Sequence, residues 1–380
     1  MTATSGVTTA PITLRSPHDL LASIPYQLGF RPTESVVLAC VTRRRRLDLV
    51  ARVGLDDLER DPAGVLDTLR RAVVQVDPAM CALVVYTARA APDVAGQVST
   101  VRDAVGPLVE LDEWLVTPEG YRGLGCTDGT CCPEAGHPLE TLRSSPAEAA
   151  HVLAGRYVAD SAEEAFRIDT ADPAPRGLAA RAARRSEESR HRHGGDVDAD
   201  RAWRRDALAA WRAALRESAH TFTVPDAAIP VALLGRVAAA LDDRQVRDAA
   251  LLTLVPGGDG AADATIDPTA TADAATARMM AAVTDPGSAV RPDDERTEVA
   301  VHLLQQVVAH APRRLAPAPL TLLAFLAWWQ GDGPRASHRL TQVHRLDPRY
   351  RLALLLGSVL TAGLPPGWIR AEAHAQERPA

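Results

Sequence analysis

The sequence contains no lysine and no asparagine, so all 42 of its Lys-or-Arg residues are arginine. Without lysine there is no Walker A phosphate loop, because that loop places a lysine on the phosphates. A pyridoxal phosphate Schiff base and a lysine nucleophile are excluded for the same reason. The His-Glu-x-x-His and Gly-x-Ser-x-Gly motifs are also absent from the chain. The sequence therefore contains none of the catalytic signatures of these enzyme classes.

Long apolar runs and targeting signals are absent as well. The longest apolar run, 319–329, is far shorter than the ~20 residues that a membrane-spanning helix needs. The N-terminus has neither a basic region nor an apolar core, which are the marks of a signal peptide. Five cysteines, an odd number in a long chain, do not indicate a secreted disulfide framework. We expect a cytoplasmic protein with reduced cysteines and no membrane association.

The composition is that of a soluble globular protein, with 46% hydrophobic and 24% charged residues. At ~150 residues per domain, a chain of 380 residues predicts two domains. Aromatic residues make up only 4%, so we expect a core of Leu, Val and Ala. The net charge of −6 argues against nucleic acid as a partner. The four arginines at 43–46 are expected to form a solvated turn, because no aromatic residue is interleaved with them.

The first half alternates strand-like and helix-like segments. Residues 35–41 and 47–53 are rich in Val and Leu and flank a polar turn, which predicts a β-hairpin. Apolar stripes at helical spacing alternate with further short apolar runs up to about residue 125. We predict an α/β domain over 12–168 with a mixed sheet, preceded by a disordered tail at 1–11.

The second half is expected to be helical. Residues 169–200 have hardly any large apolar side chains, which favours a linker, an insertion or a solvated helical segment. Helical periodicity then continues over 201–370, interrupted at 257–271 by a Gly- and Ala-rich stretch that we interpret as a flexible loop. A disordered tail is predicted for 371–380. The sequence thus predicts an all-α domain after the α/β domain.

Residues 320–348 resemble one tetratricopeptide unit. Gly331 and Asp332 stand at the expected tight turn, Ala336 is the small residue of the second helix, and Pro348 closes the unit. Ala327 departs from the aromatic residue that is usual at its position. Because a single copy cannot build a solenoid, we expect a helical hairpin packed on its own domain. By analogy with the repeat family, a peptide-binding groove is an alternative.

Chemistry-capable side chains crowd together in only one stretch, 114–138, which holds three of the five cysteines. Cys126, Cys131, Cys132 and His137 are the ligand types of a tetrahedral zinc site, so zinc is the one cofactor considered. The spacing contains no Cys-x-x-Cys pair. In addition, adjacent residues such as Cys131 and Cys132 point in opposite directions from an extended backbone.

Two other interpretations of the same loop stay open. In the first, one of the three cysteines is a reactive thiol, activated by Arg122 or His137, with Asp128 as an acid–base group. In the second, 126–138 is a tight ordered loop with no chemistry, in which one cysteine packs inward and prolines stiffen the chain. The first interpretation lacks an identified base with an orienting partner.

Four stretches together resemble a known family: PHDLLASIPYQLGFRPTESVVL near the start, CTDGTCCPEAGHP, DDRQVRDAALL, and GDGPRASHRLTQVHRLDPRYRLALLL with GLPPGWIR. They are similar to the uncharacterised domain-of-unknown-function family numbered 4192, found in high-GC Gram-positive bacteria. The resemblance covers nearly the whole chain, with 169–200 and 257–271 fitting poorly, like insertions. It implies a bacterial cytoplasmic protein and supplies no activity, cofactor or catalytic residue.

Two hypotheses about function follow. The first is a non-enzymatic binding or regulatory protein that uses the helical half or the interdomain cleft for a protein partner. It rests on the missing catalytic motifs and on the tetratricopeptide-like hairpin. The alternative is a metalloprotein or thiol-dependent enzyme centred on the loop from Cys126 to His137. The sequence does not specify a substrate or an oligomeric state.

Overall fold

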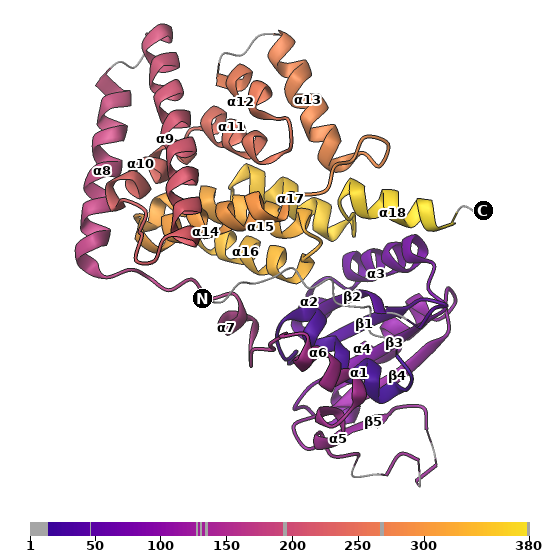
Figure 1. Cartoon of the computed structure of the whole chain (residues 1–380). Helices are drawn as coiled ribbons and strands as arrows, with labels where there is room; N and C mark the ends of the chain where they lie inside the picture. The colour runs from indigo at the N-terminus through magenta and orange to yellow at the C-terminus, as the bar shows by residue number, and fades with distance from the viewer. Residues whose placement is uncertain are drawn as a thin grey trace. The chain divides into compact units, whose positions relative to one another are not determined.

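The computed structural model describes residues 14–45, 47–126, 128–129, 131–133, 136–192, 196–266 and 270–377. The tail predicted at 1–11 lies outside these residues. The chain forms two compact units, and each is described by itself (Figure 1). The first ends at Arg167 and also includes Thr361–Leu364; the second is Ile168–Leu360 with the residues from Pro365 onwards. The first is α/β and the second is mostly helical, which confirms the predicted fold class.

The first unit is built on a five-stranded sheet with the order β2-β1-β3-β4-β5. β3 and β4 are parallel, while every other neighbouring pair is antiparallel, so the sheet is mixed as predicted. The predicted hairpin is the β1–β2 pair. The strands are β1 Ser35–Val41, β2 Leu47–Gly54, β3 Met80–Tyr86, β4 Leu111–Val116 and β5 Tyr121–Gly123.

Helices cover both faces of this sheet, because successive side chains of a strand point to opposite sides. Val37 and Ala39 of β1 join the core on the side of α1, whereas Val36 and Leu38 join the core on the other side. The first side carries α1 Pro17–Leu28, α5 Glu140–Arg143, α6 Pro146–Leu153 and α7 Ala162–Ala165. The other carries α2 Leu55–Arg60, α3 Pro62–Val76 and α4 Ala91–Val105.

Two cysteines of the sheet, Cys40 and Cys81, are core side chains. Cys40 and Cys81 face each other across β1 and β3, with their sulfur atoms 3.3 Å apart. Neither side chain is exposed to solvent. They behave as small apolar residues within the core, away from the cysteine loop.

The second unit packs its helices around a core that contains the fully buried Trp211 and Trp329. All residues of its central helix, α15, are buried. The helices are α8 Pro173–Arg192, α9 Val197–Thr223, α10 Val231–Asp242, α11 Arg244–Leu254, α12 Asp259–Ile266, α13 Ala270–Thr284, α14 Asp294–His310, α15 Pro317–Trp329, α16 Gly333–Leu346, α17 Arg351–Thr361 and α18 Gly367–Glu377, with a 3₁₀ turn η1 at Arg313–Leu315.

The structure differs from the prediction of a linker or insertion at 169–200. α8 spans most of that stretch and packs closely on α10. The contact is made by small residues: Ala179 and Ala183 are fully buried, and a Cβ atom on Gly235 would lie 2.1 Å from the Ala179 carbonyl oxygen. A helix that packs through alanine and glycine needs no large apolar side chains, so composition alone indicated a solvated segment.

Two further boundaries are corrected. The stretch 257–271, predicted as a flexible loop, contains α12, which buries Ala262 and Ile266 in the core of its unit. The tail predicted at 371–380 begins inside α18, which continues to Glu377. In both cases short, alanine-rich helices carry too weak an apolar periodicity to be recognised from sequence.

α15 and α16 form the helical hairpin expected at 320–348. Gly331 adopts a φ of 85° in the connection, and the Asp332 side chain caps α16 by accepting the Arg335 amide hydrogen at 2.9 Å. Ala336 is fully buried, which allows the two helices to approach closely. Because α15 is buried along its whole length, this hairpin is part of the core of its unit.

No helix within the described ranges combines the length and the apolar character that crossing a membrane would require.

The contact of α6 with α1 predicts a pH-dependent stability. The rings of His151 and Tyr26 stack 4.2 Å apart, and His151 is 1% exposed. Burial, and then the charge of Arg156, lowers the pKa of His151 to about 4. The unfolded chain therefore binds a proton that the folded chain does not between about pH 6.5 and pH 4. The stability that depends on neutral His151 is fully present above pH 6.5 and is lost as the pH falls from 6.5 towards 4.

We expect the free energy of unfolding of the first unit to drop by about 2 kcal/mol between pH 7.5 and pH 5 through His151. Hydrogen exchange of the β3 amides, corrected for the intrinsic pH dependence of exchange, measures it. His151→Phe keeps a stacking ring without a titrating group and should abolish most of the drop. An equal drop in both proteins would contradict this assignment.

Candidate functional site

The cysteine loop leaves the sheet from its edge strand, β5, and returns to the same strand. Tyr121 and His137 exchange two backbone hydrogen bonds, of 2.9 Å and 2.7 Å, which close the loop at its base. The Tyr121 hydroxyl and the Thr141 hydroxyl are 2.8 Å apart, which fixes the chain that follows. The loop is thus anchored at its base, although its tip is exposed.

The three loop cysteines converge. The sulfur atoms of Cys126, Cys131 and Cys132 all lie within 4.8 Å of one another. Cys126 and Cys131 are exposed and Cys132 is half-buried; all three are free thiols. Among the described residues, this is the one group of three or more potential metal ligands that meets at a point.

A turn at Asp128 brings the neighbouring cysteines to the same side. The Asp128 carbonyl accepts the Cys132 amide hydrogen at 2.7 Å, and its carboxylate accepts the Cys131 amide hydrogen at 3.4 Å. The backbone at 131–132 is therefore turned, and the alternation of an extended chain does not apply. Gly123 lies beneath the cluster, where an added Cβ would be 3.4 Å from the Cys132 sulfur. Asp128 thus acts here as a turn former.

His137 stands beside the sulfur cluster, and its ring nitrogens are not part of it. Its Nε2 atom lies 2.7 Å from the Cys131 carbonyl oxygen, so this nitrogen donates the hydrogen bond. Its ring also lies 5.2 Å from the Tyr121 ring and 6.0 Å from the His18 ring. In this geometry His137 orients the backbone of Cys131. The potential metal ligands that converge are the three thiols.

The neighbouring thiols disfavour Cys131 as the reactive thiol. The hydrogen bond to Cys126, and then the negative charge that Cys126 and Cys132 would carry, raises the pKa of Cys131. A nucleophilic cysteine needs the opposite, because the thiolate is the reactive form. A divalent cation bound at the three sulfurs would reverse the effect by stabilising the thiolates together.

The distances fit a thiophilic metal. Zinc binds sulfur at about 2.3 Å, so tetrahedral geometry places two sulfur ligands about 3.8 Å apart. Separations below 4.8 Å are thus close to what a metal requires, with little movement of the loop. Three thiolates leave the fourth tetrahedral position to a ligand other than these sulfurs.

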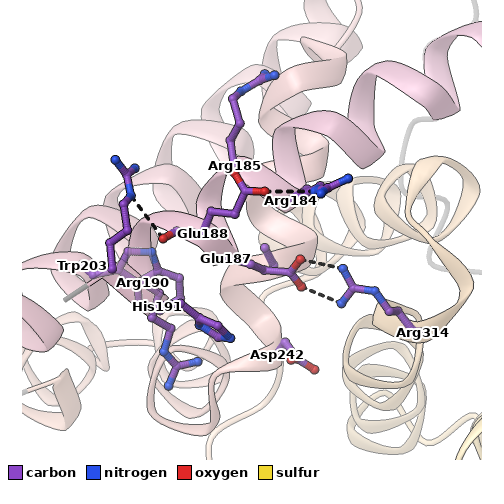
Figure 2. A pocket seen from close by; sticks show the side chains of 11 residues that line it. Arg184, Arg185, Glu187, Glu188, Arg190, His191, Trp203, Asp242 and Arg314 are labelled. Atoms are coloured by element: carbon purple, nitrogen blue, oxygen red, sulfur yellow. Dashed lines mark hydrogen bonds and ion pairs between the residues drawn. The ribbon is translucent and has the colours of Figure 1, made fainter. Parts of the chain in front are cut away.

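The second unit contains an arginine-lined cavity of about 1030 Å³ (Figure 2). Much of its charge is internally paired: Arg314 forms two hydrogen bonds of 2.6 Å to Glu187, and Arg184 one of 3.0 Å to Glu188. Arg190 stacks over the Trp203 ring at 4.9 Å. This cavity could not be recognised from the sequence, because its walls come from four separate elements, α8, α9, α10 and η1.

These features define an α/β unit with a thiol cluster on an edge-strand loop, followed by a helical unit. The chain belongs to the family described as "Domain of unknown function (DUF4192)", whose model matches residues 17–367. The match covers the cysteine loop and all but the end of the helical unit. No curated protein and no solved structure matches the chain.

The closure of the loop can be tested at Gly136. This residue has a φ of 77°, and an added Cβ would lie 3.1 Å from the Tyr121 carbonyl oxygen. Gly136→Ala should therefore cost about 1–2 kcal/mol locally and speed hydrogen exchange at the Tyr121 and His137 amides. Gly125→Ala is the matched control, since nothing lies within 4 Å of its Cβ position. Equal exchange in the two variants would show that the bridge does not close the loop.

Proposed function

We propose that the protein is a metal-binding regulatory protein whose loop holds one zinc ion through Cys126, Cys131 and Cys132. The observation that carries the proposal is the convergence of the three sulfur atoms within 4.8 Å. When bound, zinc would supply a rigid cross-link of the loop and a Lewis-acidic open position. The convergence of three thiols supports metal binding over a thiol-dependent enzyme, because a nucleophile needs one thiol beside a base whereas a metal needs several ligands at one point.

The chain's own residues would prepare this site in three ways. The Asp128 turn sets the direction of the two neighbouring thiols. The Tyr121–His137 bridge fixes the ends of the loop, which lowers the conformational entropy lost on binding. The His137 ring holds the Cys131 carbonyl. His137, considered a ligand from sequence, is here a positioning residue.

Metal content tests the proposal directly. The protein purified with zinc in excess and then dialysed should retain one zinc ion per chain, measured by plasma mass spectrometry. Cys131→Ser should lower the zinc affinity at least about a hundredfold, since it removes one of three ligands from the centre of the cluster. Cys40→Ala, in the core of the sheet, is the control and should retain the metal.

The reactivity of Cys131 distinguishes the metal site from the thiol-enzyme alternative, which requires fast labelling. In the metal-free protein the raised pKa should make Cys131 react with iodoacetamide more slowly at pH 7 than a free cysteine does. Mass spectrometry of the labelled peptide measures the rate. Fast labelling of Cys131 together with substoichiometric zinc would refute the metal site and favour a nucleophile.

As a second function, we propose that the helical unit binds an acidic segment of a partner protein in the cytoplasm. The arginine-lined cavity favours it: Arg185 and Arg192 line the cavity and form no ion pair with any residue that the structure describes. The tetratricopeptide-like hairpin of the same unit adds an analogy with protein-binding repeats. The chain's net charge of −6 argues against nucleic acid as the occupant.

A fluorescein-labelled glutamate-rich peptide is a suitable probe of that surface. Its anisotropy should show binding that weakens with added salt, because the contacts are exposed ion pairs. The double variant Arg185→Ala, Arg192→Ala should bind about tenfold more weakly, while Arg205→Ala on α9 should match the wild type. Equal affinity of the two variants, or tighter binding of an oligonucleotide than of the peptide, would contradict this function.

A further inference from the structure

A separate cavity, of about 250 Å³, lies in the first unit at the carboxyl ends of β3 and β4. The last residues of these two parallel strands, Tyr86 and Val116, pair in register and both line the cavity. α/β proteins commonly bind ligands in the crevice beyond the carboxyl ends of parallel strands, where the chain leaves the sheet in separate loops. We propose that this cavity binds a small carboxylate with an apolar body.

The walls of the cavity are largely apolar. Leu21 and Ala22 contribute from α1, and Leu139 and Leu142 from the chain that follows the cysteine loop. Drug-sized ligands occupy pockets of about 300–1,000 Å³, so this cavity is suited to a smaller molecule. An aromatic or branched aliphatic group would bury its surface here.

One side of the cavity is fixed by Glu34, whose backbone has an unusual φ of 41°. Its carboxylate accepts hydrogen bonds from the Ala88 amide at 2.8 Å and the Thr87 hydroxyl at 3.1 Å, and pairs with Arg89 at 2.9 Å. These partners satisfy both carboxylate oxygens of Glu34. Arg89 also pairs with Asp56 at 2.9 Å and with Glu59 at 3.3 Å, so its single charge is shared among three carboxylates. Strained backbone of this kind, held by several hydrogen bonds, is concentrated at ligand sites.

Two guanidinium groups complete the site. Arg143 is exposed and has no ion pair with any residue in the described parts of the chain. Arg31 is 3.6 Å from Asp160, in a pair whose side chains are 48% and 88% exposed, so water competes strongly for it. The lining holds these two arginines and one carboxylate, that of Glu34, so its net charge is positive. A guanidinium binds a carboxylate through two parallel hydrogen bonds.

The other polar groups of the lining favour a monoanion over a phosphate. The Thr87 hydroxyl is used by Glu34 and by the Arg89 amide, and the Thr117 hydroxyl contacts the Gly120 carbonyl at 3.3 Å. The two arginines and one glutamate of the lining leave one positive charge, which balances a carboxylate but not a phosphate dianion. No cysteine lines this cavity, so carboxylate binding here does not depend on metal binding by the loop.

Phenylacetate and its neutral isostere phenylacetamide are the probes for the test. We expect phenylacetate to shift the amide signals of Thr87 and Thr117 in NMR titrations of the full chain. Phenylacetamide should bind at least about tenfold more weakly, because it loses the charge-assisted hydrogen bonds. Arg143→Glu should lose phenylacetate binding. Since Arg143 is exposed, this change should leave the fold intact, and Arg205→Glu in the second unit is the control of equal charge change.

Three results would overturn the inference. The first is equal binding of phenylacetate and phenylacetamide, which would remove the role of charge. The second is equal affinity of Arg143→Glu and Arg205→Glu for phenylacetate, which would place the anion elsewhere. The third is competition by inorganic phosphate at the same concentration as phenylacetate, which would make the apolar walls irrelevant.

Discussion

The backbone bridge between Tyr121 and His137 is the constraint on which the candidate site depends. Two hydrogen bonds of 2.9 Å and 2.7 Å join the start and the end of the cysteine loop to one edge strand. Within a loop closed in this way, a single turn at Asp128 is enough to bring three sulfurs together. Without the bridge, the cysteines would belong to a long exposed loop with no reason to share a position.

The same bridge links the loop to the small cavity of the first unit. Pro138 follows His137 directly and its carbonyl accepts a hydrogen bond from the Thr141 hydroxyl, which is also 2.8 Å from the Tyr121 hydroxyl. Leu139 and Leu142, on either side of Thr141, line the cavity. One edge strand thus positions both the thiol cluster and a wall of the proposed carboxylate site.

Much of the fold could be predicted from the sequence, because it depends on strong local signals. The Val-rich strands and the apolar stripe of α3 are each specified within a few residues. α8 was harder to recognise, since its packing uses alanines and the backbone of Gly235 on another helix. Such contacts depend on the tertiary arrangement and leave little trace in hydrophobic periodicity.

The candidate site was predictable in its residue types and not in its geometry. The sequence placed Cys126, Cys131 and Cys132 together in one loop, but the adjacency of the last two argued against convergence, because that reasoning assumed an extended backbone. The i to i+4 hydrogen bond from Cys132 to Asp128 removes the difficulty. Arg31, Glu34 and Arg143 carry no motif, since two segments far apart in the sequence bring them to one cavity.

The most direct test of the central claim is the ligand shell of the metal itself. X-ray absorption at the zinc edge of the loaded protein should show three sulfur neighbours at about 2.3 Å and one lighter neighbour. That result would establish that the loop closed by Tyr121 and His137 presents its thiols to a single ion. A shell of nitrogen and oxygen atoms without sulfur would contradict the account.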